Sequence, residues 1–421
     1  MPRLPARARV RPLGVGERTL ARLFRRHTGP SLAQWRQRAR VPGSPRHLAA
    51  GMPVTRVADP PGCDDPAAYT TAFRTLLGRP GPPYGGHAGH RPRDDHASSL
   101  GAMVEHRMVD VNGIRLHIAE EGEGPLVVLL HGFPESWHSW HRQFGPLAAA
   151  GFRVVAPDQR GYGRSDHPEA VDAYTILHLV GDVVGLIREL GEEKAYVVGH
   201  DWGAPVAWHT ALLRPDLVRG VAGLSVPPPF RGSRPPLPAM EQMFGGRFYW
   251  NYFNRPGVAD AEFAEDTRTA LRKFFYWGSG DAPGAGRKQP LVDPERGWLA
   301  DMADPEVLPE WFTEEDLDAL TESFSQGFTG ALNWYRNLDR NWELTAPWHG
   351  AVVTPPSLYI YGDRDVVPAF PGTPELIERL PSLMPGLRRE PLKLAGCGHW
   401  TQQERPDEVN AALIEFLTSC P

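Results

Sequence analysis

Cysteine is scarce in this chain of 421 residues, and its three cysteines, Cys63, Cys397 and Cys420, stand far apart. Such a set cannot form the disulfide framework of a small secreted domain, and no Cys/His spacing typical of a metal site is present. No apolar run reaches the ~20 residues that cross a bilayer, and the N-terminus lacks the apolar core of a signal peptide. We therefore expect a cytoplasmic protein without a membrane partner, and no metal or other cofactor.

Lysine is absent from the first 102 residues, which contain 17 arginines and six acidic residues and so carry a net charge of +11. The rest of the chain contains 28 basic and 44 acidic side chains, a net charge of −16. The chain therefore joins two segments of different character. Its length is sufficient for more than one domain with a large core.

The basic segment begins with apolar residues at helical spacing beneath an arginine-rich face, over residues 14–26. Together with residues 31–36, 48–58 and 67–74, this stretch resembles the DNA-binding half of AraC-type transcription regulators. In that family, two helix-turn-helix units each place a recognition helix in the major groove. The resemblance implies DNA as a possible partner of this part of the chain.

Several prolines lie where the AraC-type family has helices, and they are incompatible with those helices. Pro42 and Pro45 fall where the linking helix of the family runs, and Pro60 and Pro61 break the second unit. Each proline inside a helix costs about 3 kcal/mol. We therefore interpret residues 1–80 as a degraded helix-turn-helix remnant, and we do not expect it to bind DNA. On this interpretation, translation originally started at Met103 or Met108, downstream of the remnant. The Gly-, Pro- and His-rich residues 81–104 that follow are typical of a linker.

From residue 105 onward, short apolar runs alternate with helical patterns. Residues 106–111 and 114–120 flank Asn-Gly, which favours a two-residue hairpin, and residues 125–130 and 152–156 are typical of strands buried on both faces. Residues 174–190 have the spacing of an amphipathic helix. This order predicts an α/β fold with a mostly parallel sheet, built from residues 105–226 and 350–421.

The most informative motif is Gly-His-Asp-Trp-Gly at residues 199–203, between a predicted strand and a predicted helix. Two glycines allow the sharp turn of a nucleophile elbow, which exposes the side chain between them. In this chain that side chain is Asp201, which is anionic at pH 7 and can attack carbon directly. The resulting alkyl ester of Asp201 requires a base-activated water and hydrogen-bond donors for the oxyanion. The alternative is an ordinary turn in which an aspartate caps the helix.

Other segments at the same edge of the predicted sheet supply the oxyanion donors and the base that this ester requires. A tight loop, His-Gly-Phe-Pro at residues 131–134, follows a buried strand, so the backbone N–H groups of Phe133 and Trp202 are candidates for the oxyanion hole. Later in the chain, Asp365 ends a strand and His399 lies between Gly398 and Trp400. The order of nucleophile, acid and base predicts that Asp365 orients His399, which deprotonates water. Asp363 is the rival acid.

The long segment 227–349 is rich in aromatic residues and far too long for a loop, so we expect it to form a helical lid over Asp201. Residues 131–137, 199–203 and 398–402, together with lid residues 247–257 and 330–337, resemble the epoxide hydrolase family of α/β-hydrolases. The resemblance covers residues 105–418. It implies that Asp201 is the nucleophile, that Asp365 and His399 are the charge-relay pair, and that Tyr249 and Tyr335 activate the epoxide.

Two phenols suit this chemistry because opening an epoxide leaves an alkoxide, which needs a proton donor at neutral pH. Tyr252, by contrast, is expected to pack with a satisfied hydroxyl group. The expected substrate pocket is formed by His131, Pro134, Phe253, Trp334 and Trp400.

The predicted function is conversion of a small epoxide and water into a vicinal diol. A haloalkane dehalogenase would use the same aspartyl ester, but it often has an asparagine in place of Phe133 to hold the halide. A serine esterase is disfavoured because neither Ser136 nor Ser225 lies in an elbow. The alternative from another class is an AraC-type DNA-binding regulator with a hydrolase-like domain.

Overall fold

The structure, a computed structural model, describes residues 104–286 and 289–420. The predicted helix-turn-helix remnant and all but the last residue of the predicted linker lie outside these residues. Within the described part of the chain, no helix is both long enough and apolar enough to cross a membrane.

The centre of the described part is an eight-stranded sheet in the order β1-β2-β4-β3-β5-β6-β7-β8. The first two strands form a hairpin, and β2 pairs with β4 in antiparallel fashion; every other pairing is parallel. The strands are β1 (Glu105–Val111), β2 (Ile114–Glu121), β3 (Leu126–Leu130), β4 (Arg153–Pro157), β5 (Ala195–His200), β6 (Val218–Leu224), β7 (Ser357–Gly362) and β8 (Leu392–Leu394). This arrangement confirms the predicted α/β fold with a mostly parallel sheet.

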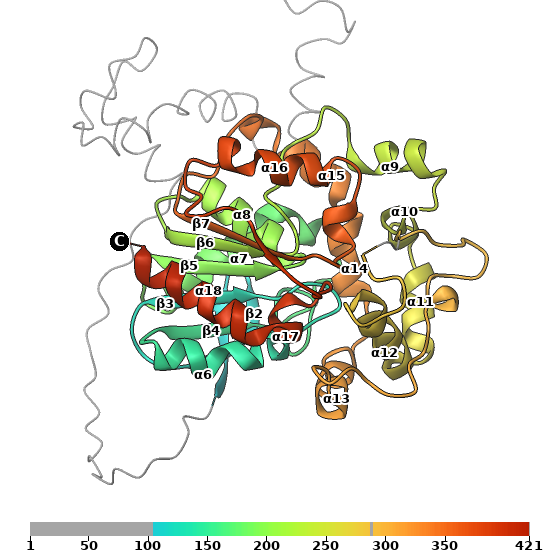
Figure 1. The fold of residues 1–421 in the computed structure, drawn as a ribbon, viewed down its shortest axis with the longest axis horizontal. Coiled ribbons are helices and arrows are strands. Elements are labelled where there is room, and N and C mark those ends of the chain that lie inside the picture. Colours follow the sequence, from blue (N-terminus) through green and yellow to red (C-terminus); the bar gives the residue numbers. More distant parts are fainter. Residues whose placement is uncertain (1–103, 287–288, 421) are drawn as a thin grey trace, which may run out of the picture. The chain divides into compact units, whose positions relative to one another are not determined.

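Helices cover both faces of the sheet (Figure 1). The core helices are α6 (His141–Ala149), α7 (Ile176–Glu189), α8 (Gly203–Leu213), α16 (Thr373–Leu383), α17 (Thr401–Glu404) and α18 (Pro406–Ser419), with short 3-10 helices η1 (Trp137–Trp140), η2 (Val171–Tyr174) and η5 (Val367–Ala369). The predicted helix at 174–190 begins later, at Ile176, because Thr175 is extended and the preceding turn is η2.

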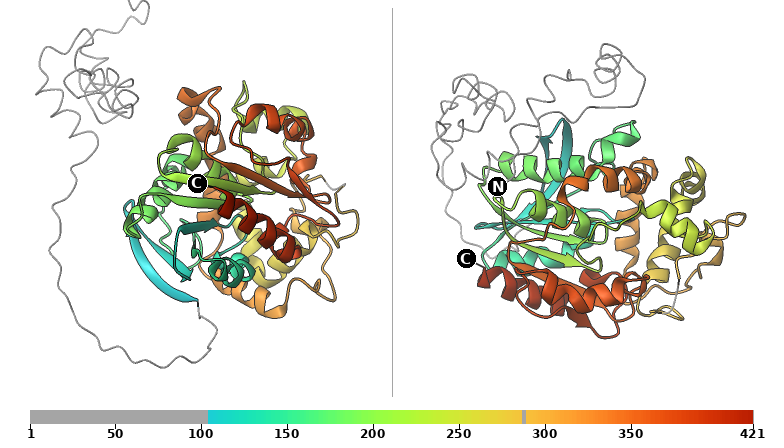
Figure 2. Two further views of the ribbon diagram at one scale, coloured as in Figure 1. Left: turned by 60° about the vertical axis from the view of Figure 1, so that its left-hand side comes forward. Right: turned by 90° about the horizontal axis from the view of Figure 1, so that it is seen from above.

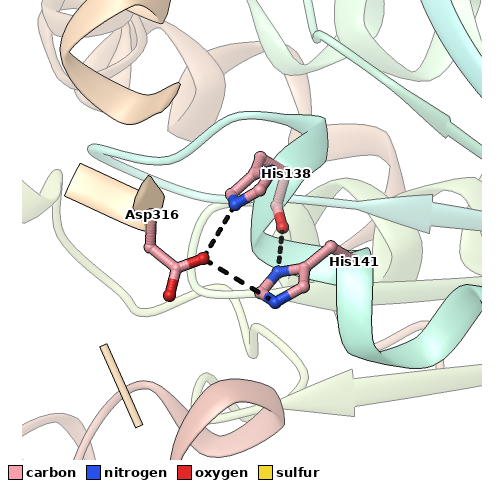
Figure 3. Close-up of side chains that lie close together, drawn as sticks. All are labelled: His138, His141 and Asp316. Atoms are coloured by element: carbon pink, nitrogen blue, oxygen red, sulfur yellow. Dashed lines mark hydrogen bonds and ion pairs between the residues drawn. The ribbon is translucent and has the colours of Figure 1, made fainter. Parts of the chain in front are cut away.

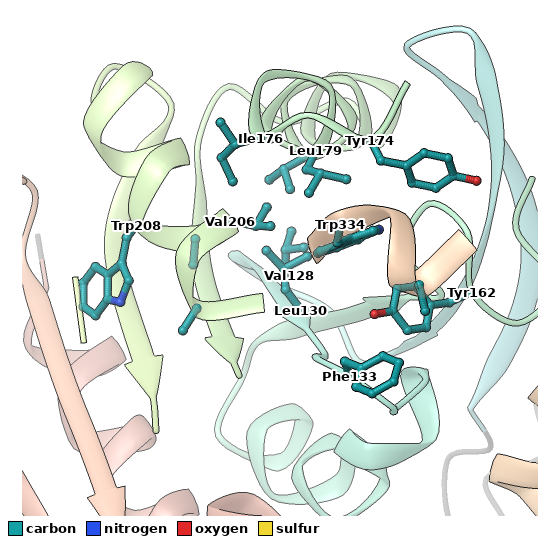
Figure 4. Packing of buried hydrophobic residues seen from close by; sticks show 14 of the residues in the cluster. Val128, Leu130, Phe133, Tyr162, Tyr174, Ile176, Leu179, Val206, Trp208 and Trp334 are labelled. Atoms are coloured by element: carbon teal, nitrogen blue, oxygen red, sulfur yellow. The ribbon is translucent and has the colours of Figure 1, made fainter. Parts of the chain in front are cut away.

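Successive side chains along the strands point to opposite faces of the sheet and pack into two separate hydrophobic cores. In β3, Val128 and Leu130 belong to the core beneath α7 and α8, whereas Val127 and Leu129 belong to the core beneath α6 and α18. Figure 4 shows the first core, where side chains of β3, α7 and α8 pack together with Trp334 of the lid. Burial on both faces explains why the parallel strands have nearly continuous apolar runs.

The segment expected to form the lid lies between β6 and β7 and is helical. Its elements are α9 (Pro236–Phe244), α10 (Tyr249–Phe253), α11 (Val258–Glu265), α12 (Thr267–Gly278), η3 (Leu299–Asp301), α13 (Glu314–Ser323), α14 (Thr329–Arg336), α15 (Leu338–Leu344) and η4 (Ala346–Trp348). The right view of Figure 2 shows that the yellow helices of this segment gather at one side of the sheet. We call residues 227–349 the lid.

Candidate active site

Asp201 occupies the sharp turn between β5 and α8. Its backbone has a φ of 47°, in the left-handed region that few non-glycine residues adopt. A Cβ atom on Gly199 would collide with the backbone of Gly203, and one on Gly203 would collide with the backbone of Leu130. The two glycines therefore allow the close approach that holds the aspartate side chain out at the carboxyl edge of the sheet.

The carboxylate of Asp201 contacts two of the predicted partners. Its Oδ1 accepts a hydrogen bond of 2.8 Å from the Phe133 backbone N–H, and its Oδ2 lies 3.4 Å from Nε2 of His399. Burial alone would raise the pKa of Asp201, but His399, His200 and the Phe133 N–H outweigh it and lower the pKa. Asp201 is therefore an anion with one oxygen anchored by a backbone donor.

Asp365 is the acid that lies beside His399. Its Oδ1 is 3.0 Å from His399 Nδ1 and also accepts a hydrogen bond of 3.0 Å from the Val367 N–H. The hydroxyl of Ser225 also lies 3.0 Å from the same ring nitrogen. The rival, Asp363, is exposed at the end of β7, so the structure does not place it in this cluster.

The charge of His399 depends on both carboxylates. Burial would lower the pKa of His399, but Asp365 and Asp201 raise it well above the ordinary value of 6.5. The pair of carboxylates therefore favours an imidazolium in the resting site. Loss of the negative charge on Asp201 would lower the pKa of His399, so that the imidazole more readily gives up its extra proton and becomes neutral, the form that can accept a proton from water.

The two predicted lid tyrosines lie next to each other. Tyr249 begins α10 and Tyr335 lies in α14, and their ring centroids are 5.8 Å apart. Burial, to which the Asp201 carboxylate adds, raises the pKa of both phenols above the ordinary value of 10. Both tyrosines are therefore protonated donors at neutral pH. Tyr252 instead donates its hydroxyl proton to Glu262 at 2.9 Å, as its expected packing role requires.

Two cavities meet at Asp201. The larger has a volume of about 370 Å³ and is lined mainly by apolar side chains, among them Pro228, Phe230, Trp250 and Leu338. This volume is in the range of small-molecule sites. The smaller, about 30 Å³, has room for water, and its lining includes Asp201, Tyr249, Tyr335, His399 and Trp400.

Four of the five residues expected to form the pocket line neither of these two cavities. His131 bonds the Gly132 carbonyl and the Gln159 N–H, Trp334 donates to the Arg160 carbonyl, and Phe253 packs edge-on against Phe133 and Tyr335. Together with Pro134 they are buried and line neither of the two cavities, whereas Trp400 lines the smaller one. The indole of Trp202 lines the larger cavity and packs 5.2 Å from Tyr335.

A fully buried carboxylate, Glu135, ties the active-site loops together. It accepts hydrogen bonds from the Gly132 N–H at 2.6 Å and the Gln402 side-chain amide at 3.1 Å, and its Oε2 lies 2.7 Å from His200 Nδ1. The other nitrogen of His200 lies 2.8 Å from the carbonyl of His399. Through these contacts, Glu135 and His200 connect the loop after β3 to the backbone of His399.

A second carboxylate, Glu404, supports the loop that carries His399. It accepts hydrogen bonds from the backbone N–H groups of Gly398 at 2.8 Å, Trp400 at 3.1 Å and Gly280 of the lid at 2.9 Å. Burial raises the pKa of Glu404 to about 7, against the opposing effect of these donors. The sequence predicted no role for Glu135, which lies within a matching motif, or for Glu404, which follows one, because a motif does not show which backbone groups a side chain reaches.

Comparison with known proteins gives two family matches. Residues 125–406 match the family described as alpha/beta hydrolase fold, and residues 10–80 match a helix-turn-helix domain. The second match agrees with the resemblance seen in the sequence, on residues that the structure does not describe.

Individual relatives agree with the first match. Epoxide hydrolase A of Mycobacterium tuberculosis (strain ATCC 25618 / H37Rv) is 47% identical over 325 residues, 76% of this chain and 98% of that protein. Epoxide hydrolase 3 of Siraitia grosvenorii is 43% identical over 75% of this chain and 98% of its own length. Among solved structures, an epoxide hydrolase from an endophytic Streptomyces has a TM-score of 0.72 at 47% identity, covering 76% of this chain and 96% of that one. Epoxide hydrolase A from Mycobacterium thermoresistibile has a TM-score of 0.70 at 47% identity, with 76% and 99% covered.

Proposed function

Because this chain belongs to the epoxide hydrolases of the α/β-hydrolase fold, we propose that it converts a small epoxide and water into a vicinal diol through an ester on Asp201. The observation that carries the assignment of residues is the small cavity in which Asp201 and His399 face two protonated phenols, Tyr249 and Tyr335. The apolar wall of the larger cavity suits an epoxide with an apolar substituent.

In the first step, Oδ2 of Asp201 attacks one carbon of the epoxide, since Oδ1 is held by the Phe133 N–H. The carbon–oxygen bond breaks, and its electron pair goes to the epoxide oxygen, which takes a proton from Tyr249 or Tyr335. The products of this step are a hydroxyalkyl ester of Asp201 and a tyrosinate. Holding the reacting groups in one buried cavity supplies the orientation that direct displacement needs.

Ester formation removes the negative charge of Asp201, and this loss lowers the pKa of His399. The tyrosinate takes the extra proton of the imidazolium, and the neutral His399 then takes a proton from a water molecule, which attacks the carbonyl carbon of the ester. The Phe133 N–H supports the oxyanion on Oδ1, and we assign the second donor to the Trp202 N–H. The departing diol oxygen takes the proton from His399, and the proton of the regenerated acid then passes to the neutral imidazole, which restores the resting state.

Replacing the two lid phenols tests the proton-donor assignment. Tyr249→Phe and Tyr335→Phe alone should each lower kcat by about 10- to 100-fold, and the double variant by about 10³- to 10⁴-fold, since no phenol then remains to protonate the oxygen. Steady-state diol formation measures the effect. Tyr252→Phe is the matched control, because its hydroxyl already donates to Glu262; it should keep near-parent turnover. Near-parent activity of the double variant would contradict the assignment.

Haloalkane dehalogenation is the enzymatic alternative, because it needs the same aspartyl ester. Phe133 offers no side-chain donor for a halide, and the paired phenols suit an alkoxide better. Styrene oxide, an aliphatic epoxide and a bromoalkane assayed side by side decide between the two. We expect diol from the epoxides without halide from the bromoalkane; halide release with no diol would reverse the choice.

Deleting residues 1–102 tests the proposal that residues 1–80 are a remnant with no part in hydrolysis. We expect unchanged diol formation, because every proposed active-site residue follows residue 104. The regulator alternative predicts that the full chain binds DNA selectively and in a salt-sensitive way, and that the deletion abolishes this binding. Fluorescence anisotropy with DNA at two salt concentrations, run beside the hydrolysis assay, separates the outcomes.

We propose a cytoplasmic location from the scattered cysteines alone.

A further inference from the structure

Two histidines of the core face an aspartate of the lid, away from Asp201. His138 lies in η1, His141 begins α6, and Asp316 lies in the first turn of α13 (Figure 3). The two imidazole rings stack with their centroids 4.5 Å apart. This cluster is built from segments almost 180 positions apart in the sequence, so only the closed packing of lid on core brings it together.

The three ligand atoms have the spacing of a metal site. Oδ1 of Asp316 lies 2.8 Å from Nε2 of His138 and 3.7 Å from Nε2 of His141, and all three atoms lie within 4.8 Å of one another. Zinc bonds of about 2.0–2.2 Å in a tetrahedral site place ligand atoms about 3.3 Å apart. Small side-chain rotations, together with release of the proton that Nε2 of His138 donates to Asp316, therefore bring all three atoms to bonding distance from one ion.

Neighbouring hydrogen bonds already orient two of the three ligands. His141 donates from Nδ1 to the carbonyl of His138 at 2.8 Å, which leaves the lone pair on Nε2. Metal-binding histidines commonly donate their second nitrogen in this way. Oδ2 of Asp316 accepts from the N–H and hydroxyl of Thr313 at 2.9 and 3.0 Å, so Oδ1 is the oxygen turned toward the histidines.

A neighbouring arginine lowers the metal affinity of this cluster, but the cluster remains accessible to water. Arg142 lies nearby, with Nε 3.3 Å from Nε2 of His141, and its positive charge opposes that of a metal ion. Its guanidinium also donates to the carbonyls of Gln403 and Trp311, which can hold it when the bond to His141 is given up. The side chains of His138 and His141 are 22% and 30% exposed, so water can complete the coordination.

We propose that His138, His141 and Asp316 bind one divalent transition-metal ion of the zinc class. Two imidazoles and one carboxylate suit zinc or nickel rather than calcium or magnesium, which prefer oxygen ligands. Because two ligands belong to the core and one to the lid, the ion holds α13 on η1 and α6 and stabilises the closed lid. The site has no part in the proposed hydrolysis.

The test is a zinc titration of the full chain, freed of any purification tag, in competition with a chromophoric chelator. The parent should bind one zinc ion that His141→Gln and Asp316→Asn each weaken by about 10- to 100-fold or more, since each removes one ligand. The control is the double variant His178→Gln/His349→Gln, which changes two exposed histidines outside the cluster and should leave this ion in place. Zinc should also raise the Tm of the parent and the control, but not that of either cluster variant.

Histidines in residues 1–103 can bind zinc independently, so the decisive quantity is the difference between parent and variants. Asp316 also accepts hydrogen bonds from Thr313 at the start of α13, so Asp316→Asn can weaken the fold by itself. His141→Gln avoids that difficulty. Equal zinc stoichiometry and affinity in the parent and His141→Gln, or no zinc binding by the parent, would overturn the proposal.

Discussion

Asp201→Ala should lower diol formation by about 10⁴-fold or more, because no other group in the elbow can displace the epoxide oxygen. The carboxylate of Asp201 is buried at the sheet edge, anionic, and held by the Phe133 N–H. Without this carboxylate no ester forms, so the phenols have no ring opening to assist and His399 has no ester to hydrolyse. Turnover of a chiral epoxide, followed by chromatography of the diol, measures the loss.

The matched control for this variant is Asp363→Asn. Asp363 is an exposed acid at the end of β7, outside the cluster of Asp201, His399 and Asp365, so its loss should leave turnover near that of the parent. Thermal unfolding of both variants separates a lost nucleophile from a lost fold. If Asp201→Ala keeps substantial activity while folded, the carboxylate is not the nucleophile.

His399→Gln should separate the two chemical steps, with ring opening retained and ester hydrolysis slowed by about 10³- to 10⁴-fold. Glutamine can fill much of the space of the imidazole, but it cannot take a proton from water. The protein should therefore accumulate an adduct whose mass equals that of the added epoxide, visible by mass spectrometry of the intact chain. Peptide mapping should place the adduct on Asp201.

A variant of Asp365 makes the comparison sharper. Asp365→Asn keeps His399 but removes the carboxylate that lies 3.0 Å from Nδ1 and raises the pKa of the imidazole. We expect slower ester hydrolysis and a smaller amount of adduct than with His399→Gln. Absence of any adduct in His399→Gln, combined with unimpaired diol release, would refute the role of this histidine.

Much of the fold could be predicted from the sequence because local patterns determine it. Asn112 and Gly113 form the turn between β1 and β2, and α8 ends at Leu213, two residues before Pro215. The nucleophile elbow was predictable for the same reason, since Gly199 and Gly203 are required by contacts within a few residues and with one neighbouring strand. These features depend on short stretches of chain.

The walls of the cavity could not be predicted in this way. His131 and Trp334 lie in matching motifs, but their polar atoms bond backbone groups behind the cavity, and the wall is formed instead by residues such as Phe230 and Leu338. Which side of a buried aromatic residue faces a cavity depends on how the lid packs. Motif resemblance gives no information about that packing.

Contacts between distant segments also escaped prediction. Glu404 reaches the N–H of Gly280 across more than 120 positions, and Asp316 reaches His138 across almost 180. In the sequence, nothing connects His138 and His141, which are three positions apart, with the distant Asp316. Only the closure of the lid onto the core gives them a carboxylate partner.

The most direct test of the proposed ester is one turnover in water enriched in oxygen-18, with enzyme in excess over epoxide. Water attacks the carbonyl carbon of the Asp201 ester, so the label should enter the carboxylate of Asp201 while the first diol carries none. Mass spectrometry of the peptide that contains Asp201, and of the diol, reads both positions. Label in the diol from the first turnover, with none in Asp201, would show direct attack of water on the epoxide and contradict the mechanism.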